Sequence, residues 1–267
     1  MNPLLLKCLP ALLTGMALLS ACAQVQMQSD AATGVRSLRV QGPIDLQLHE
    51  GGEEPAEAPS APLRRWVEDG GGTLVLATPE GSGGRIAAQL TLPLLQQISI
   101  TGGGHVRGGT LRARTVDLQL GGASSLTLKG VTATRLTIGM GGSGDLLLGR
   151  VEAESAQARV SGSGHLYLRE LRVNDWEASL GASGQLHAAG WAARQRWSLS
   201  GSGDVHAMQL DGQQVQLACY GSGDSLLGRS QRLDLQLVGS GDVSYLGQPD
   251  LQINQWGSGR AVARAGS

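Results

Sequence analysis

Three histidines, a tyrosine and an aspartate recur in this sequence at an interval close to 20 residues. They are His165, Tyr167, His187, Asp204 and His206. If successive intervals stack as β-strands, the Cα atoms of His187 and His206 lie roughly 5 Å apart. Imidazole and carboxylate groups so placed bind transition metals, and with a phenol they also bind saccharides. Polar residues on a solvated strand face gather in the same way without a ligand, and we favour that interpretation and predict no metal site.

Aspartate follows the tripeptide Gly-Ser-Gly at four places, Asp145, Asp204, Asp224 and Asp242. A row of carboxylates suggests calcium, but the calcium-binding β-roll has a nine-residue period. The interval here is about twice as long and brings one aspartate at most. We therefore expect each carboxylate to accept a hydrogen bond from a backbone N–H of its own turn.

The sequence contains none of the short motifs that mark serine hydrolases, zinc proteases, nucleotide-binding loops or paired-cysteine metal sites. The Gly-Ser-Gly segments are not phosphate loops, because no helical pattern follows them to supply N-terminal N–H groups. We therefore predict a protein that is not an enzyme, with no catalytic residue and no cofactor.

These side chains lie at fixed distances from a glycine-rich tripeptide that repeats along most of the chain. The structure that the repeat forms must therefore position them. The central residue of the tripeptide lies at Gly103, Ala123, Ser143, Ser163, Ser183, Ser202, Ser222, Ser240 and Ser258. A regular period of this length is the signature of a stacked solenoid.

Apolar and polar residues alternate on both sides of each tripeptide, which is typical of strands with one buried face. One repeat cannot bury that face alone, but stacked repeats can. The sequence therefore predicts an all-β fold: a single-domain parallel β-helix with coils of about 20 residues. Each coil is expected to contain a strand, a glycine corner, a second strand and a looser turn. Connections between parallel strands are nearly always right-handed, so we favour a right-handed coil.

A second glycine closes each corner. These glycines are Gly144, Gly164, Gly184, Gly203, Gly223, Gly241 and Gly259. We expect glycine there because a Cβ would either meet the neighbouring coil or need a positive φ.

The alternation also assigns the cysteine and the tryptophans of the repeats. Cys219, Trp176 and Trp197 fall on inward positions, so we interpret Cys219 as a small buried hydrophobe rather than a nucleophile. Trp256 falls at a corner near solvent, where it can stack on a sugar or cap the last coil, and we favour the cap.

The N-terminus reads as an export signal. Lys7 precedes a short apolar stretch that ends in Leu19-Ser20-Ala21-Cys22. The stretch is too short to span a bilayer comfortably. Behind it we expect a flexible tether over 22–34 and the β-helix over 35–267, with regular coils from about 101. The acidic, proline-rich segment from Glu50 to Pro62 cannot be a central strand and is expected to be a loop.

Residues 19–22 resemble the signal box of bacterial lipoproteins. The resemblance implies a signal peptide over 1–21 and a lipid on Cys22, and it makes an ordinary secretory signal the less favoured alternative. Alanine rather than aspartate after the cysteine implies sorting to the outer membrane. Such a lipid, diacylglycerol with palmitate, tethers a protein without threading it through the membrane.

Composition excludes further classes of partner. The formal net charge is −1, there is no Phe among 267 residues, and 16% of residues are charged. Without a basic surplus, we expect no nucleic acid partner. Low aromatic content suits a narrow interior filled by aliphatic side chains.

The export signal and the repeated Gly-Ser-Gly-Asp corners also resemble a known family, the auto-transporter adhesin head GIN domain family. The resemblance covers roughly residues 35–260, and it implies an exported bacterial β-helical protein. Its most specific parts are the corners that begin at Gly142, Gly201, Gly221 and Gly239.

Three functions are compatible with these features. We favour a non-enzymatic, lipid-anchored envelope protein that acts as an adhesin-like surface scaffold. The second is a polysaccharide-active or polysaccharide-binding β-helix, and the third is a periplasmic component that binds envelope proteins. The expected partners are the membrane, through the lipid, and envelope proteins or glycans. The sequence leaves the membrane face and the oligomeric state open.

Overall fold

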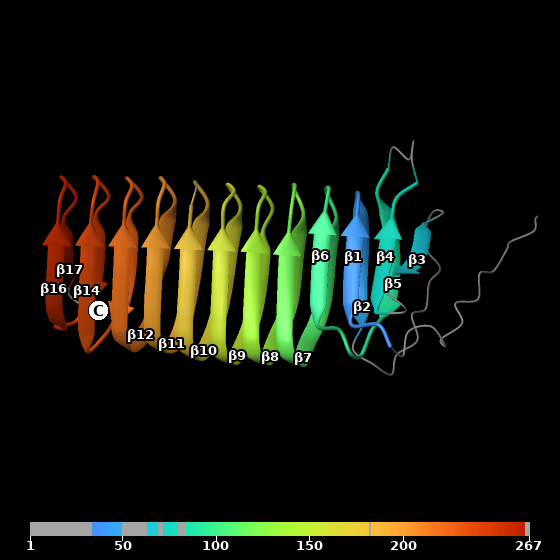
Figure 1. Ribbon diagram of the computed structural model, residues 1–267, viewed down its shortest axis with the longest axis horizontal. Helices are drawn as coiled ribbons and strands as arrows, with labels where there is room; N and C mark the ends of the chain where they lie inside the picture. The colour runs from blue at the N-terminus through green and yellow to red at the C-terminus, as the bar shows by residue number, and fades with distance from the viewer. Residues whose placement is uncertain (1–33, 50–62, 69–71, 80–83, 182, 265–267) are drawn as a thin grey trace, which may run out of the picture.

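The computed structural model describes residues 34–49, 63–68, 72–79, 84–181 and 183–264, and every regular element in these ranges is a β-strand (Figure 1). The first six strands are short: β1 (Ser37–Gln41), β2 (Ile44–His49), β3 (Arg64–Glu68), β4 (Thr73–Ala77), β5 (Ile86–Thr91) and β6 (Gln97–Thr101). Six long strands follow: β7 (His105–Leu120), β8 (Ser125–Met140), β9 (Leu146–Val160), β10 (His165–Leu180), β11 (Gln185–Leu199) and β12 (Asp204–Cys219). The last five are short again: β13 (Ser225–Arg229), β14 (Arg232–Leu237), β15 (Val243–Leu246), β16 (Asp250–Gln255) and β17 (Ala261–Arg264).

The expected parallel β-helix is confirmed, since equivalent residues of successive coils pair in parallel about 20 residues apart. Val106 pairs with Leu126, and Leu126 pairs with Leu146. Figure 1 shows the coils side by side along one long axis, with their glycine corners at one edge of the stack. Each coil thus contributes one rung to each of two facing sheets.

The predicted looser turn is not a separate element in the regular coils. β7, for example, runs without interruption over 16 residues from one glycine corner to the next. It bends between the two sheets but keeps its pairing with β8 on both sides of the bend. The chain continues as a strand there because Leu111–Val131 and Ala113–Ala133 still pair.

Where a repeat is one residue shorter than its neighbour, the missing residue is at this bend. The pairing of β10 with β11 shifts register between Leu168 and Leu171, and that of β11 with β12 shifts between His187 and Ala189. A bulge absorbs the missing residue locally. The corners and both sheets therefore stay aligned although the repeat varies in length.

The first coils are not stacked in the order of the sequence. β1 pairs in parallel with β4 on one side and with β6 on the other, and β2 lies in the same way between β5 and β7. The coil of β4 and β5 is therefore outermost, although it comes second in the chain. β3 pairs antiparallel with the outer edge of β4, which covers that edge of the stack.

Aliphatic ladders fill the space between the sheets, and the predicted inward residues belong to them. Cys219 is 2% exposed and pairs in register with Leu199 and Leu237. Trp176 and Trp197 are buried as expected, with their ring centroids 5.8 Å apart in an edge-to-face arrangement. Trp256 differs, because its side chain is 66% exposed. This exposure confirms the expected position near solvent, and the capping role stays a prediction.

The corners need glycine because neighbouring coils approach each other closely there. A Cβ on Gly164 would lie well inside contact distance of the Gly144 carbonyl oxygen, and one on Gly259 would do the same at Gly241. The described glycines with positive φ are others: Gly42, Gly102, Gly122, Gly190, Gly239 and Gly247. Of the two predicted reasons, steric approach therefore applies at the second glycine of each corner, and positive φ is found instead at the first glycine of some corners, such as Gly102 and Gly239.

Candidate functional site

The structure confirms that one outward column runs the length of the regular coils. In register, its residues are Arg107, Thr127, Leu147, Tyr167, His187, His206, Leu226 and Ser244. The three rings of this column, which we call the His–Tyr ladder, stack on one another. The centroids of Tyr167 and His187 are 4.8 Å apart, and those of His187 and His206 are 4.5 Å apart with an interplanar angle of 6°.

This stacking limits what the ladder can bind. Stacking occupies both faces of His187 and one face each of Tyr167 and His206, so the middle ring presents only its edge, with hydrogen-bonding atoms, to a ligand. Parallel imidazoles do not direct their in-plane lone pairs at one metal ion. No group of three or more metal-binding side chains was found among the described residues.

Burial also keeps the centre of the ladder neutral. The pKa of His187 lies below its ordinary value, first because partial burial disfavours the charged ring and then because His206 and His165 are near. An uncharged ring stacks without repulsion between its neighbours. The ladder is therefore a packed outer column at neutral pH.

The two remaining candidates of this face are His165 and Asp204. Each lies two residues before its ladder residue, Tyr167 and His206 respectively, and is therefore nearer the glycine corner. His165 and Asp204 are both opposite Gln185 in the neighbouring coils. The ring centroid of His165 is 6.2 Å from that of Tyr167. Asp204 is engaged elsewhere, because its Oδ1 accepts the backbone N–H of Asp224 at 2.9 Å.

That hydrogen bond is one of a series that corrects the expected role of the aspartates. Asp224 accepts the N–H of Asp242 at 2.8 Å, and Asp242 accepts the N–H of Arg260 at 2.8 Å. Asp145 accepts the N–H of His165 at 3.3 Å. The N–H therefore belongs to the next coil and not to the same turn, so these carboxylates link coils where the backbone leaves the regular ladder.

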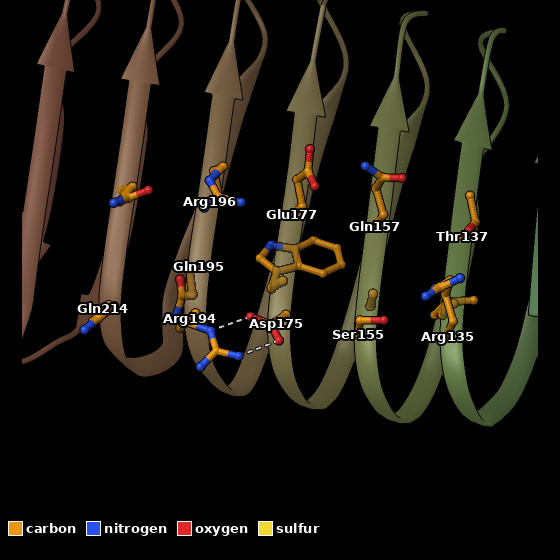
Figure 2. A pocket seen from close by; sticks show the side chains of 14 residues that line it. Arg135, Thr137, Ser155, Gln157, Asp175, Glu177, Arg194, Gln195, Arg196 and Gln214 are labelled. Carbon is orange, nitrogen blue, oxygen red and sulfur yellow. Dashed lines mark hydrogen bonds and ion pairs between the residues drawn. The ribbon is translucent and has the colours of Figure 1, made fainter. Parts of the chain in front are cut away.

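A second candidate site lies on the other sheet. A groove of about 340 Å³ crosses β8 to β12, and Figure 2 shows its side chains in two rows. We call it the polar groove. Its outward lining residues are Arg135, Ser155, Asp175, Arg194 and Gln214 in one row and Thr137, Gln157, Glu177, Arg196 and Gln216 in the other. Sequence reasoning did not single out these residues, although their alternation with buried positions placed them on one face.

An ion pair dominates the polar groove. Arg194 binds Asp175 through two hydrogen bonds, at 2.5 and 2.6 Å, which Figure 2 marks. The hydrogen bond from Arg194 holds the pKa of Asp175 below its ordinary value, and the charges of Arg194 and Arg196 add to the effect. Asp175 therefore stays ionised at neutral pH. Glycoside hydrolysis needs a carboxyl group whose pKa is raised, and Asp175 is shifted the other way.

Behind the polar groove, one buried polar side chain was not foreseen. Gln195 is 4% exposed, accepts the indole N–H of Trp197 at 3.1 Å and donates to the carbonyl of Asp211 at 3.2 Å. The sequence signal for its burial was its place between Arg194 and Arg196, because a residue between two outward residues of a strand points inward. Since these bonds satisfy the amide, Gln195 supports the wall of the groove and does not offer itself to a ligand.

Fold and surface together define a repetitive all-β solenoid with a sealed core and polar outer columns. The chain belongs to the family described as "Putative auto-transporter adhesin, head GIN domain", whose model matches residues 36–185 and 147–249. The resemblance in the sequence is thereby confirmed, and the chain carries an adhesin-like domain.

Solved structures share the fold at low sequence identity. A "putative adhesin" from Parabacteroides merdae superposes with a TM-score of 0.63 at 16% identity, over 86% of this chain and 91% of that one. A "putative lipid binding protein" from Parabacteroides distasonis gives a TM-score of 0.59 at 19% identity, over 85% and 92% of the two chains. No curated protein matches the chain.

Several predicted features lie outside the described residues. They are the signal peptide over 1–21, the lipidated Cys22, most of the tether over 22–34 and the segment from Glu50 to Pro62. Within the part of the chain that the structure describes, no helix is long and apolar enough to cross a membrane.

Proposed function

We propose that this chain is a non-enzymatic, lipid-anchored protein of the cell envelope whose β-solenoid presents an adhesin-like contact surface. The observation that supports this most is the combination of family membership with a column of outward side chains that stays in register from Arg107 to Ser244. A surface built by repetition suits an extended partner, because each coil adds a similar contact at a spacing of about 4.8 Å.

The anchor in this proposal is Cys22. Acylation of its sulfur would hold the solenoid at the membrane, and the residues that follow would act as a tether. We further propose the outer membrane as its place, because Ala23 rather than aspartate follows the cysteine.

A polysaccharide-active enzyme is the alternative that the polar groove could favour, since Asp175 and Glu177 both line it. The ion pair of Asp175 with Arg194 argues against it, because it keeps the carboxylate charged where an acid is needed. We therefore retain glycans as partners of the surface and not as substrates.

Cells that express the full chain with an epitope tag test the proposal. The wild-type protein should partition into detergent with the membrane fraction, lose its tag to protease added to intact cells, and increase adherence to immobilised glycans or envelope proteins. Cys22→Ser should leave the protein soluble or unprocessed and abolish the gain in adherence.

Three results would contradict the proposal. Equal partitioning of Cys22→Ser and wild type would remove the lipid anchor. Release of reducing ends from a panel of polysaccharides by the purified protein, lost in Asp175→Asn, would make it an enzyme. Protection from protease in intact cells would instead place it on the periplasmic side and contradict a surface adhesin.

A further inference from the structure

A hollow with unpaired cations lies on the outer face of the first regular coils. It measures about 740 Å³ and extends from β2 across β7, β8 and β9 to β10. Its charged side chains are Arg107, Lys129 and Arg169, with His49 at one end. No carboxylate is among the described residues that line it. We call this feature the basic hollow.

The basic hollow follows from the register of the coils. His49, Gly109, Lys129, Gly149 and Arg169 fall at equivalent outward positions, two residues beyond the column that contains Arg107. Glycine thus alternates with a side chain that bears nitrogen. Lys129 and Arg169 are two coils apart, which is about 10 Å at the usual strand spacing. The hollow is therefore a trough along the solenoid axis with cations at intervals.

Some other arginines of the first coils are paired with carboxylates, and the three cations of the basic hollow are not. Arg39, Arg85 and Arg150 each pair with a carboxylate. Arg107, Lys129 and Arg169 form no ion pair with any residue that the structure describes. Glu170, next to Arg169 in sequence, is already bound by Arg150 and Arg172. A concave patch of uncompensated positive charge on a chain of net charge −1 is a feature that points to an anionic ligand.

We propose that the basic hollow binds an acidic polysaccharide, a linear glycan that bears a carboxylate or sulfate group at regular intervals. The glycan would run along the solenoid axis, with its anionic groups on Arg107, Lys129 and Arg169 and its hydroxyls on Gln47 and Thr127. A glycan with one acidic group per sugar presents charges at about the spacing of one coil, roughly 4.8 Å, so every second group falls at the spacing of Lys129 and Arg169. Bidentate arginine contacts suit planar carboxylates and sulfates alike.

The same geometry disfavours two other anions. Duplex DNA carries about one charge per 1.7 Å of its axis, far denser than three cations along this trough. Among the described residues, the lining also contains no Phe, Tyr or Trp ring on which bases could stack. A membrane that carries anionic headgroups is flat, whereas these cations line a concave trough, and the vesicle probe below tests that distinction.

This inference extends the proposed function by naming a ligand class. The test of the inference does not depend on the proposed function. Purified protein can bind or fail to bind a glycan whether or not the chain is anchored or acts in adherence. The probes are alginate and dextran sulfate, with neutral dextran, single-stranded DNA and vesicles that contain phosphatidylglycerol for comparison.

Affinity measured by calorimetry or gel retardation should rank alginate and dextran sulfate above every other probe. Lys129→Gln with Arg169→Gln should weaken glycan binding by at least about tenfold, since each charge-assisted hydrogen bond is worth about that much. Arg114→Gln with Arg159→Gln removes two exposed cations outside the hollow and should change affinity less than about twofold. Circular dichroism confirms that both double variants stay folded.

Three outcomes would overturn the proposal. Equal weakening in the two double variants would show general electrostatic attraction and no site. Tighter binding of DNA or of the vesicles than of either acidic glycan would assign the hollow to a different partner. Absence of binding to both acidic glycans at low salt would remove the glycan altogether.

Discussion

The same inward position is sealed in the middle of the solenoid and open at its C-terminal end. Leu217 and Leu235 are 2% and 1% exposed, whereas Ile253, the next residue of their column, is 41% exposed. All three are aliphatic residues of strands with the same alternation. Their burial differs because β14 has β12 and β16 on its two sides, while β16 pairs with β14 alone among the described strands.

The two ends differ as well. At the other end of the stack, β3 covers the outer edge of β4 with an antiparallel pairing. Burial at the C-terminal end thus depends on the neighbouring coil. Ile86 and Leu90 of β5 stay buried although β5 pairs with β2 alone among the described strands, so the other end of the stack is closed differently. Stability should likewise depend on neighbouring coils, because a solenoid is held together by contacts between adjacent coils.

The largest expected effect comes from a corner glycine inside the stack. Gly164→Val should lower the free energy of unfolding by more than about 3 kcal/mol, because the added side chain overpacks against the Gly144 carbonyl, a backbone group that cannot move aside as a flexible side chain would. Gly259→Val creates the same clash with Gly241 but should cost much less, because the terminal coil can detach. Urea denaturation of both variants measures the difference, and equal midpoints would contradict the comparison.

Core truncation should separate the two regions next. Leu217→Ala should destabilise by about 3 kcal/mol, as is usual for a sealed aliphatic residue that leaves a cavity. Ile253→Ala should cost less than about 1 kcal/mol, because its side chain is already partly in water. Thermal melts of the two variants against wild type provide the measurement, and a larger loss for Ile253→Ala would reverse the account.

The interior of the stack was predictable because one pattern repeats in it. Column membership of Cys219, Trp176 and the His–Tyr ladder followed from alternation and spacing alone. The exchanged order of the first two coils did not, because β1, β4 and β6 offer similar patterns and any of them can stack on any other. The choice is made by pairing over 36 to 60 residues, which local periodicity does not report.

Three further features of the candidate sites could not be derived from the sequence. The partner of each aspartate depends on where the carboxylate points, and a pattern cannot tell an N–H of the same turn from one of the next coil. The Asp175–Arg194 pair needed the bulge in β10 and β11 to set its register. The basic hollow required knowing that β2 lies beside β7.

A smaller effect should appear when pH changes the ladder in the middle of the stack. The pKa of His187 is lowered in the folded protein, chiefly by burial, from an ordinary value of 6.5. The unfolded chain therefore binds this proton more readily, so stability is complete above pH 6.5 and declines as pH falls toward the folded pKa. His187→Leu should flatten that decline. Melting temperatures between about pH 7.5 and 5.5 test this, and parallel curves for wild type and His187→Leu would contradict it.

The smallest effect is expected at the exposed ion pair of the polar groove. Arg194→Ala should leave the unfolding midpoint unchanged, because the two side chains are 61% and 50% exposed and solvent screens them. The carboxyl resonance of Asp175 should nevertheless titrate at a higher pH than in wild type, since the hydrogen bond that lowers its pKa is lost. An unchanged titration would show that the pair does not persist in solution.

Native-state hydrogen exchange tests the central claim most directly, because it reports the opening free energy of each coil in one experiment. The account predicts the slowest exchange for paired amides of β9 to β11, a graded loss of protection through β14, and the fastest exchange in β16 and β17. Equal protection of β10 and β16 would contradict it, because burial and stability would then not depend on neighbouring coils.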